Sequence, residues 1–391
     1  MNHQFFCKSL PNSDTTALKS GSKSKNFLGL IFKNARKSPI LAFITLGATI
    51  SLSLEANAAI VASSEFTVTS FPIGVEIDGL APSSGGLYGT DLYAAVNGGI
   101  LRVNPTSGTF TTFASGLATG AGRPSGLAFD SGIFGTGLLY VSQNNGSVAT
   151  VSPSGVVNSL SSGGTLYSSN DLVFATPGSS FGNNLIVSNG GDPPYSISKV
   201  NSTGNNSFLV PTNQFSKIPL GLAFPESGSS FGSNLFVSLW YPPTSGVSLV
   251  QVDASGNISP FANNLGLSTD LTFSSGAAFG DNIYVTDPIS QSIFKVDSNG
   301  VASIFATGFN FTNAGWDADL VFSPDGNTLF VANRNEIVKI TAKSQPPKSV
   351  PEPSNVFGLG LLGLGLAATK MKGVLSKKAK SPTDNPQEPD S

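Results

Sequence analysis

The chain has 391 residues, of which 39% are hydrophobic and only 11% charged, and its formal net charge is −2. A soluble domain usually carries about 25% charged residues. The 28 Phe residues argue against a disordered chain, because disordered chains lack such apolar surface. A charge this close to zero offers no electrostatic footprint for nucleic acid. The composition therefore favours an exported β-protein that binds no nucleic acid.

Residues 1–58 have the layout of a secretory signal peptide with a long basic region. Seven Lys and Arg residues stand against one acid before residue 39, an apolar run follows over residues 40–54, and small residues surround Ala58. This order is typical of a segment exported by the Sec machinery, and we expect signal peptidase to cleave between Ala58 and Ala59. A retained membrane anchor is the alternative, although the run is shorter than the ~20 residues of a spanning helix.

Cleavage at this position has a chemical consequence. The only histidine, His3, and the only cysteine, Cys7, both lie in the segment that would be removed. Disulfides, thiolate chemistry, Ser-His-Asp triads and His-ligated metals are then excluded. Any reaction must use carboxylates, Lys, Arg, Tyr or a metal bound by oxygen atoms.

The middle of the chain, residues 59–343, is built from a repeat. The motif Gly-Leu or Asp-Leu, often followed one residue later by Phe, recurs every 45 to 50 residues. Its leucines are Leu80, Leu127, Leu172, Leu222, Leu271 and Leu320. Each unit continues with a loop that often contains Phe-Gly, an apolar strand, an alternating strand, a Gly turn and a fourth strand. Four antiparallel strands per unit are typical of a propeller blade.

The sixth unit ends after its third strand, and residues 66–71 have the pattern of the missing fourth strand. We therefore predict an all-β, six-bladed β-propeller that is closed by an N-terminal strand, which removes the open edge of the last blade. The blade pattern resembles the NHL-repeat and gluconolactonase/regucalcin-like propellers, although no full motif is shared.

Three carboxylates stand where strand one of a unit begins, and these positions line the channel mouth of a propeller. They are Asp171, Asp270 and Asp319, and the ends of second strands, Asn189, Asp287 and Asn333, are expected to join them. Such an all-oxygen set suits Ca²⁺, which takes six to eight oxygen ligands. Residues 59–350 also carry nine basic against 17 acidic residues, which favours cations. The alternative is structural, because Asp at a strand start often accepts backbone hydrogen bonds that hold neighbouring blades together.

Two Pro-rich loops interrupt the same face. They carry Tyr195 in one case and Trp240 and Tyr241 in the other, and aromatic side chains on stiff loops suit contact with a sugar or peptide. The alternative is that Trp240 and Tyr241 fold back over the rim. Arg123 and Arg334 are expected near the same mouth, either as ligand contacts or as structural counter-ions.

The C-terminal part has three sections after a linker at residues 344–350. Pro351, Glu352 and Pro353 come first, an apolar run follows over residues 356–369, and five lysines end the section at residue 380. An acidic tail, expected to be disordered, occupies residues 381–391. Residues 351–380 resemble the PEP-CTERM sorting signal of Gram-negative bacteria, from which the extra tail departs. A short apolar helix packed on the domain is the alternative.

This resemblance implies an exosortase-type enzyme that reads Pro351, Glu352 and Pro353, and transient insertion of the segment into the inner membrane. The destination would be the cell surface or the extracellular space, where such proteins are associated with exopolysaccharide. The leading interpretation is a surface or matrix propeller that binds a glycan or protein on its channel-mouth face. The alternative interpretation is a calcium-dependent, lactonase-like hydrolase of the gluconolactonase/regucalcin type. Its usual ligand set includes a Glu, and no unit here opens with Glu.

Overall fold

The computed structural model describes residues 59–119, 125–130, 132–191, 193–240, 246–274, 278–311 and 318–343. The predicted signal peptide, the linker at residues 344–350, the sorting segment with Pro351, Glu352 and Pro353, the tail, Arg123 and Tyr241 lie outside these residues. Among the residues that the structure describes, no helix has the length and apolar character to span a membrane.

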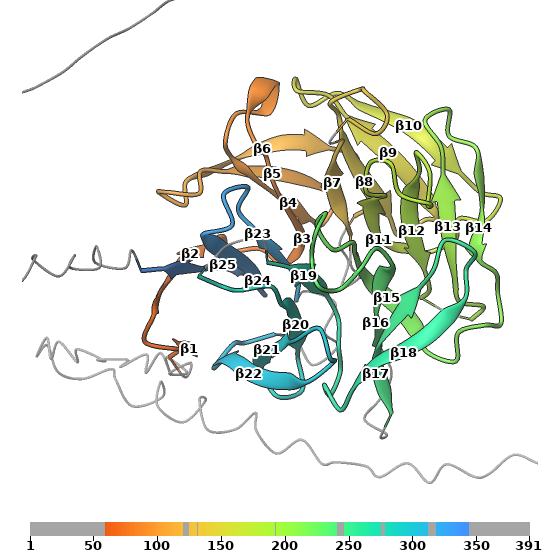
Figure 1. The fold of residues 1–391 in the computed structure, drawn as a ribbon. Helices are drawn as coiled ribbons and strands as arrows, with labels where there is room; N and C mark the ends of the chain where they lie inside the picture. Colours follow the sequence, from red (N-terminus) through yellow and green to blue (C-terminus); the bar gives the residue numbers. More distant parts are fainter. Residues whose placement is uncertain are drawn as a thin grey trace, which may run out of the picture. The chain divides into compact units, whose positions relative to one another are not determined.

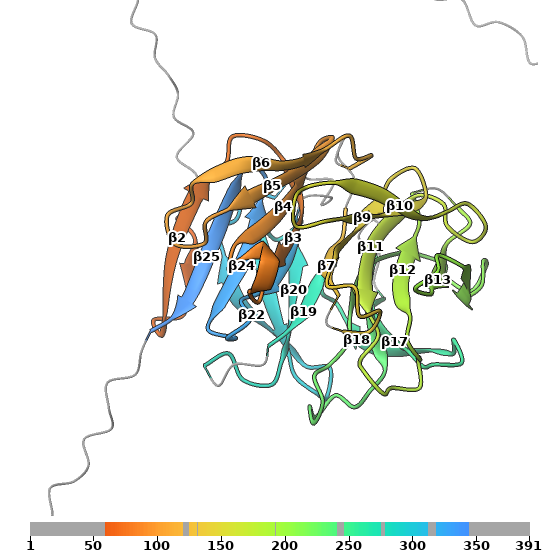
Figure 2. The ribbon, with the colours of Figure 1, turned by 90° about the horizontal axis from the view of Figure 1, so that it is seen from above.

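The described strands form six antiparallel sheets around a central channel, which confirms the predicted six-bladed propeller (Figures 1 and 2). Blades 1 to 6 are numbered by the order of their first strands. Blade 1 contains β3 (Ile77–Pro82), β4 (Leu92–Val96), β5 (Gly99–Val103) and β6 (Phe110–Ser115), with the 3-10 helix η1 (Gly86–Tyr88) after β3. Blade 2 contains β7 (Leu127–Phe129), β8 (Leu139–Gln143), β9 (Ser147–Val151) and β10 (Val157–Ser162).

The remaining blades repeat this order. Blade 3 contains β11 (Ser169–Phe174), β12 (Leu185–Asn189), β13 (Ser196–Val200) and β14 (Asn206–Val210). Blade 4 contains β15 (Ile218–Ala223), β16 (Leu235–Trp240), β17 (Val247–Val252) and β18 (Ile258–Asn263). Blade 5 contains β19 (Leu271–Phe273), β20 (Ile283–Asp287), β21 (Ser292–Val296) and β22 (Ala302–Thr307). Blade 6 contains β23 (Leu320–Phe322), β24 (Thr328–Asn333) and β25 (Glu336–Ala342).

The N-terminal segment closes the ring as predicted. Strand β2 (Phe66–Pro72) pairs along its whole length with β25 and becomes the outer strand of blade 6. The structure adds one strand that the repeat pattern did not predict, because β1 (Val61–Ala62) pairs with the end of β22 and extends blade 5 to five strands. The first two strands of the described chain therefore pair with two neighbouring blades, blade 5 and blade 6.

The apolar core lies between the blades. Six clusters of buried side chains are present in the described chain, and each joins two neighbouring sheets around the ring. Second strands such as β8, β12 and β20 are buried on both faces, which explains their continuous apolar sequences. Outer strands such as β6 are mostly exposed.

Aromatic pairs strengthen each seam between blades. The Phe of the loop after a first strand packs edge-on against the Phe that ends the first strand of the next blade. The ring centroids are 5.1 Å apart for Phe134 and Phe174, and 4.8 Å apart for Phe181 and Phe224. The same contact joins Phe231 to Phe273 and Phe279 to Phe322. The Phe-Gly loops of the repeat are thus seam contacts.

Candidate functional site: the carboxyl ring and the channel

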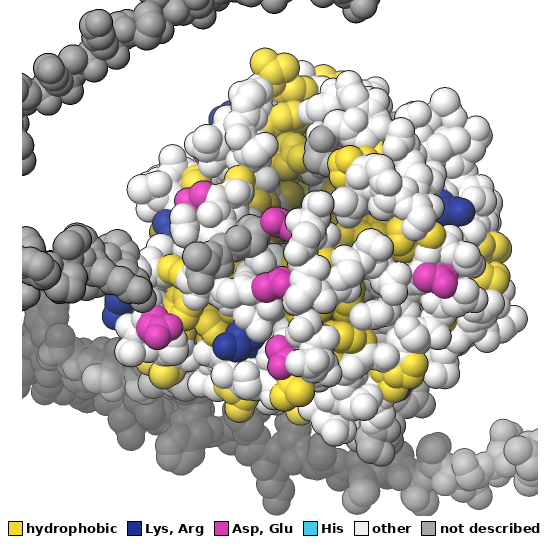
Figure 3. All heavy atoms as spheres, in the orientation of Figure 1, with side chains coloured by type: hydrophobic (Ala, Val, Ile, Leu, Met, Phe, Trp, Pro, Cys, Tyr) yellow, Lys and Arg dark blue, Asp and Glu magenta, His cyan; other side chains and the backbone are white. Residues whose placement is uncertain are grey.

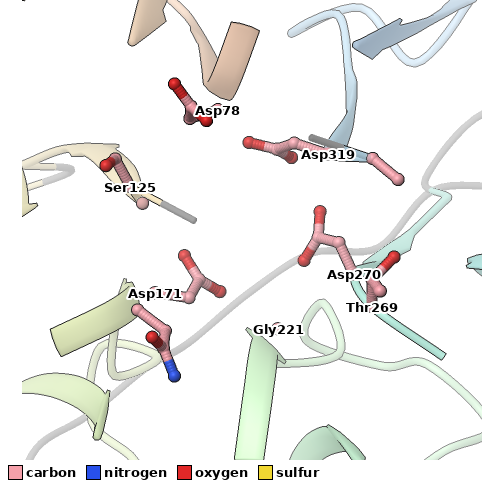
Figure 4. Close-up of a pocket in the computed structure, with 10 residues that line it drawn as sticks. Asp78, Ser125, Asp171, Gly221, Thr269, Asp270 and Asp319 are labelled. Carbon is pink, nitrogen blue, oxygen red and sulfur yellow. The ribbon is translucent and has the colours of Figure 1, made fainter. Parts of the chain in front are cut away.

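Asp171, Asp270 and Asp319 lie together where the first strands of blades 3, 5 and 6 approach the centre of the ring, and we call them the carboxyl ring. All three line a cavity of about 20 Å³, and their side chains point into the same central space (Figure 4). A cavity of this size holds about one water molecule. The ring is therefore a narrow point of the channel.

Each carboxyl group of the ring joins its own blade to the next one. The backbone N–H of Leu222 in blade 4 donates to Oδ2 of Asp171 at 2.7 Å. The N–H of Leu320 in blade 6 donates to Oδ2 of Asp270 at 3.0 Å, and that of Leu80 in blade 1 donates to Oδ2 of Asp319 at 2.6 Å. The sequence left open a structural role in which these aspartates hold neighbouring blades together. The three hydrogen bonds between blades have this form.

Glycine occupies the equivalent position in the other three blades, for a steric reason. A Cβ atom on Gly126 would collide with the carboxyl group of Asp171, and one on Gly221 would collide with that of Asp270. On Gly79 the added atom would meet the backbone carbonyl of Ser125, with Oδ2 of Asp319 3.4 Å away. The narrow ring therefore accommodates three carboxyl groups only because three neighbours have no side chain.

Burial sets the protonation state of the ring. Burial away from water, followed by the charge of Asp319, raises the pKa of Asp171 to about 8. Burial also raises the pKa of Asp270, which shares a side-chain hydrogen bond with Asp319, and burial raises the pKa of Asp319 itself. At neutral pH the ring therefore keeps protons, as expected for close carboxyl groups that cannot all ionise.

A fourth carboxyl group, on Asp78, lines the same small cavity and was missed by the sequence analysis. It lies on β3 of blade 1, is 2% exposed, and faces the central space beside Ser125 (Figure 4). The backbone N–H of Ser125 donates to the carbonyl of Asp78 at 3.1 Å. The sequence signal for it is a charged residue in an otherwise apolar strand. The repeat alignment compared the position directly before each leucine, which is Gly79 in blade 1, and Asp78 stands one position earlier.

A larger cavity of about 240 Å³ lies against the carboxyl ring. Its walls are the first strands, and the regular spacing of the repeat places one leucine of each blade there. The lining includes Leu172, Leu222, Leu271, Leu320 and Glu226, together with the three aspartates of the carboxyl ring. The surface seen in Figure 3 is mostly uncharged, with acidic side chains toward its centre. A cavity that combines apolar side chains with a few convergent polar groups is the usual form of a small-molecule site, and this lining has both kinds.

The three predicted partners from the second strands are placed elsewhere. None of Asn189, Asp287 and Asn333 is among the residues that line either central cavity. Oδ1 of Asp287 accepts from the N–H groups of Leu267 and Ile289, both at 3.0 Å. Asn189 and Asn333 likewise bond to residues of neighbouring loops and strands. These side chains shape loops.

The predicted ligand-binding residues are only partly described. Trp240 ends β16 and is half-buried, and half-buried Tyr195 packs against the core between blades 3 and 4. Arg334 occupies an exposed turn with a φ of 63°. Arg123 and Tyr241 lie outside the described residues, so the five side chains cannot be placed as one surface.

The ring does not fit Ca²⁺ as it stands. Four of its oxygen atoms already accept backbone N–H groups, whereas Ca²⁺ takes six to eight oxygen ligands. In the described part of the chain, no group of three or more acidic, His or Cys side chains is arranged to hold a metal ion.

Comparison with known proteins gives a likeness in fold. No protein-family model matches the chain, and no curated protein matches it. Among solved structures, a gluconolactonase from Xanthomonas campestris aligns with a TM-score of 0.53 at 15% identity, over 72% of this chain and 91% of its own. A virginiamycin B lyase from Staphylococcus aureus aligns with a TM-score of 0.47 at 13% identity, over 71% and 99%.

An aldose sugar dehydrogenase from Streptomyces coelicolor, solved with bound PQQ, aligns with a TM-score of 0.49 at 14% identity, over 72% of this chain and 99% of its own. At such identities the likeness shows the fold alone: the chain is a six-bladed β-propeller related in structure to a gluconolactonase.

Proposed function

We propose that the protein binds a small sugar-class molecule in the 240 Å³ cavity and that the carboxyl ring acts on it, with hydrolysis of a sugar lactone as the reaction. The observation that carries the proposal is the position of three carboxyl groups, whose pKa values burial raises, in the wall of a cavity that one leucine of each blade also lines. Titratable groups with strongly shifted pKa values in a cavity are typical of active sites. The likeness to a gluconolactonase favours a lactone over other sugars.

The chemistry needs no thiol or imidazole. A ring carboxyl in its ionised form takes a proton from water, and the water oxygen bonds to the lactone carbonyl carbon. A second, protonated carboxyl group gives its proton to the oxygen atom in the ring of the lactone. The bond between that oxygen and the carbonyl carbon breaks at the same time, so that a hydroxy acid leaves. Carboxyl groups with separated pKa values can divide the two roles. No step passes through Ca²⁺.

The test is a hydrolysis assay with δ-gluconolactone on the full chain and on Asp171→Asn, Asp270→Asn and the variant with all three ring residues changed to Asn. We expect kcat/KM to fall at least about 100-fold in the ring variants, the usual loss for general acid–base groups. Asp253→Asn, in an exposed hairpin turn, is the matched control. Wild-type turnover equal to the background would refute hydrolysis.

Calcium is tested separately. Calorimetric titration with Ca²⁺ on wild type and the triple Asn variant asks whether the ring binds a cation in solution. Saturable binding that is lost in the triple variant would restore the calcium-dependent form of the lactonase hypothesis. Assays with Ca²⁺ and with EDTA would then show whether turnover follows the cation.

A second candidate function is binding without reaction at the cell surface. It is favoured by the sequence, through the sorting-like segment at residues 351–380 and the half-buried Trp240 beside a Pro-rich loop. Exported exopolysaccharide or a surface protein would be the partner. A glycan array on wild type and Trp240→Ala tests it: a signal lost in the variant, without lactone turnover in wild type, would favour binding over hydrolysis.

A further inference from the structure

The first described residues are attached to two blades at once. Val61 pairs with Thr307 at the end of blade 5, and β2 then runs along the outer edge of blade 6. The N–H of Phe66 donates to the carbonyl of Ser63 at 3.0 Å, which fixes the turn between the two strands. The segment therefore holds the seam between blades 5 and 6 from outside.

Ala59 and Ile60 come directly before β1 in the chain and lie against Gly308. A Cβ atom on Gly308 would stand 2.7 Å from the carbonyl oxygen of Ala59 and 3.3 Å from Cα of Ile60, so only glycine allows this approach. Ile60 also packs against the apolar cluster shared by blades 5 and 6. The position of Ala59 is thus determined by close backbone contact.

Ala59 lines a cavity of about 310 Å³ together with parts of β2, Asn310, Asn333 and Glu336. Of the lining residues that the structure describes, Glu336 is the one with a charged side chain. Its Oε1 accepts from Nδ2 of Asn333 at 2.7 Å, and Oδ1 of Asn333 accepts from the N–H of Asn310 at 2.6 Å. Among the described residues the ion pair within 4.0 Å is Arg102–Asp91, so no described cationic side chain pairs with Glu336.

We propose that this cavity binds the α-ammonium group that cleavage between Ala58 and Ala59 creates, with Glu336 as its counter-ion. Before cleavage the nitrogen of Ala59 belongs to a neutral peptide bond. Hydrolysis of that bond leaves a positive charge in a cavity where the only charged side chain from the described residues is negative. Removal of the signal peptide then tightens the seam between blades 5 and 6, independently of what the channel binds.

A double comparison tests the contact. The chain starting at Ala59 is released from a fusion that leaves no extra residue, and it is compared with the same chain retaining residues 56–58. We expect the released chain to melt roughly 2 °C higher, the shift for a partly exposed ion pair in a domain of this size. Glu336→Gln removes this difference, whereas the control Glu65→Gln, on the same segment outside the cavity, preserves it.

The reactivity of the amine gives a second readout. An α-amino group has a pKa of about 7.7–8.0, and an increase of one unit lowers the free amine at neutral pH about tenfold. Acylation of the α-amine at pH 7 should therefore be about tenfold slower in the released wild type than in Glu336→Gln. Acetylation of the α-amine of the folded wild-type chain tests the same charge without a mutation and should lower its melting temperature.

Equal melting temperatures for the released and extended chains would overturn the proposal. An acylation rate that Glu336→Gln leaves unchanged would do the same. The exported protein is sequenced from its N-terminus, and a first residue other than Ala59 also contradicts the assignment.

Discussion

Single hydroxyl groups connect the blades next to the carboxyl ring, in addition to the carboxyl groups themselves. Ser238 in the second strand of blade 4 accepts from the N–H of Gly221 at 2.9 Å and donates to the carbonyl of Thr269 in blade 5 at 2.8 Å. Ser142, Ser188 and Thr286 make the corresponding bonds in their own blades. Each hydroxyl thus satisfies a backbone group on both sides of a seam, as is usual for buried polar groups.

Replacing Ser238 tests this role with a control taken from the repeat itself. Ser238→Ala removes the hydroxyl that bonds to both groups and leaves the N–H of Gly221 bonded to the carbonyl of Thr269 alone, at 3.1 Å, so we expect the free energy of unfolding to fall by about 0.5–1.5 kcal/mol. Ser238→Thr introduces the residue that blade 5 carries at the same place and should lose less. Urea unfolding followed by circular dichroism measures both. Equal losses in the two variants would mean that the side-chain volume matters and the hydroxyl does not.

Among the strands, β2 is the element on which closure of the ring depends. It supplies the outer strand of blade 6, and its first residue, Phe66, reaches into blade 5. The ring of Phe66 lies 4.7 Å from that of Phe279 and 5.2 Å from that of Phe305, between centroids. One side chain therefore joins the N-terminal strand to a blade that it does not pair with.

Truncating Phe66 should be far more costly than truncating an exposed Phe on another outer strand. Phe66→Ala removes a side chain that is 9% exposed, and we expect a loss of about 3–5 kcal/mol. Phe110→Ala on β6, where the side chain is 42% exposed, should cost less than about 1 kcal/mol. Calorimetric melting of both variants makes the comparison. Similar losses would contradict the view that Phe66 fastens the ring.

Across the whole molecule, the carboxyl ring makes stability depend on pH. The three groups belong to blades 3, 5 and 6, and burial raises their pKa values in the folded chain above those of the unfolded chain. The folded protein then binds protons more tightly than the unfolded one, so this contribution is complete below about pH 4 and is lost as the pH rises toward 8. Asp130 and Asp325 at the surface have lowered pKa values. Their contribution to stability is lost when the pH falls below the ordinary pKa of an Asp, which is the opposite direction.

We therefore expect the melting temperature of the wild type to fall by roughly 5 °C between pH 5 and pH 8. The triple Asn variant should lose this slope, because Asn keeps an oxygen to accept the interblade N–H and has no proton to release. Asp253→Asn is the control and should retain the slope, since a lowered pKa affects stability only in acid. Scanning calorimetry across this range measures the effect. A wild-type melting temperature that is constant or rises with pH would show that the ring is ionised.

The repeat itself determined the blades, their number and the closing strand. Alternation, Gly turns and a spacing of 45 to 50 residues act within one blade, where the contacting residues are close along the chain. For the same reason the sequence placed Asp171, Asp270 and Asp319 near one another, since equivalent positions of a closed ring face the same axis. Strand β1 was missed because two residues carry no periodic pattern.

What only the tertiary structure decided lies between the blades. The sequence did not indicate that each ring carboxyl bonds to the next blade, that Asp78 joins the same cavity, or that Asn189, Asp287 and Asn333 turn to neighbouring loops instead. It also did not pair the Phe of one loop with the Phe of the following blade, or bring Ala59 beside Glu336. The bond from Leu80 to Asp319, for example, joins residues 239 positions apart. Their geometry depends on the closing of the ring, which brings together residues that no local pattern relates.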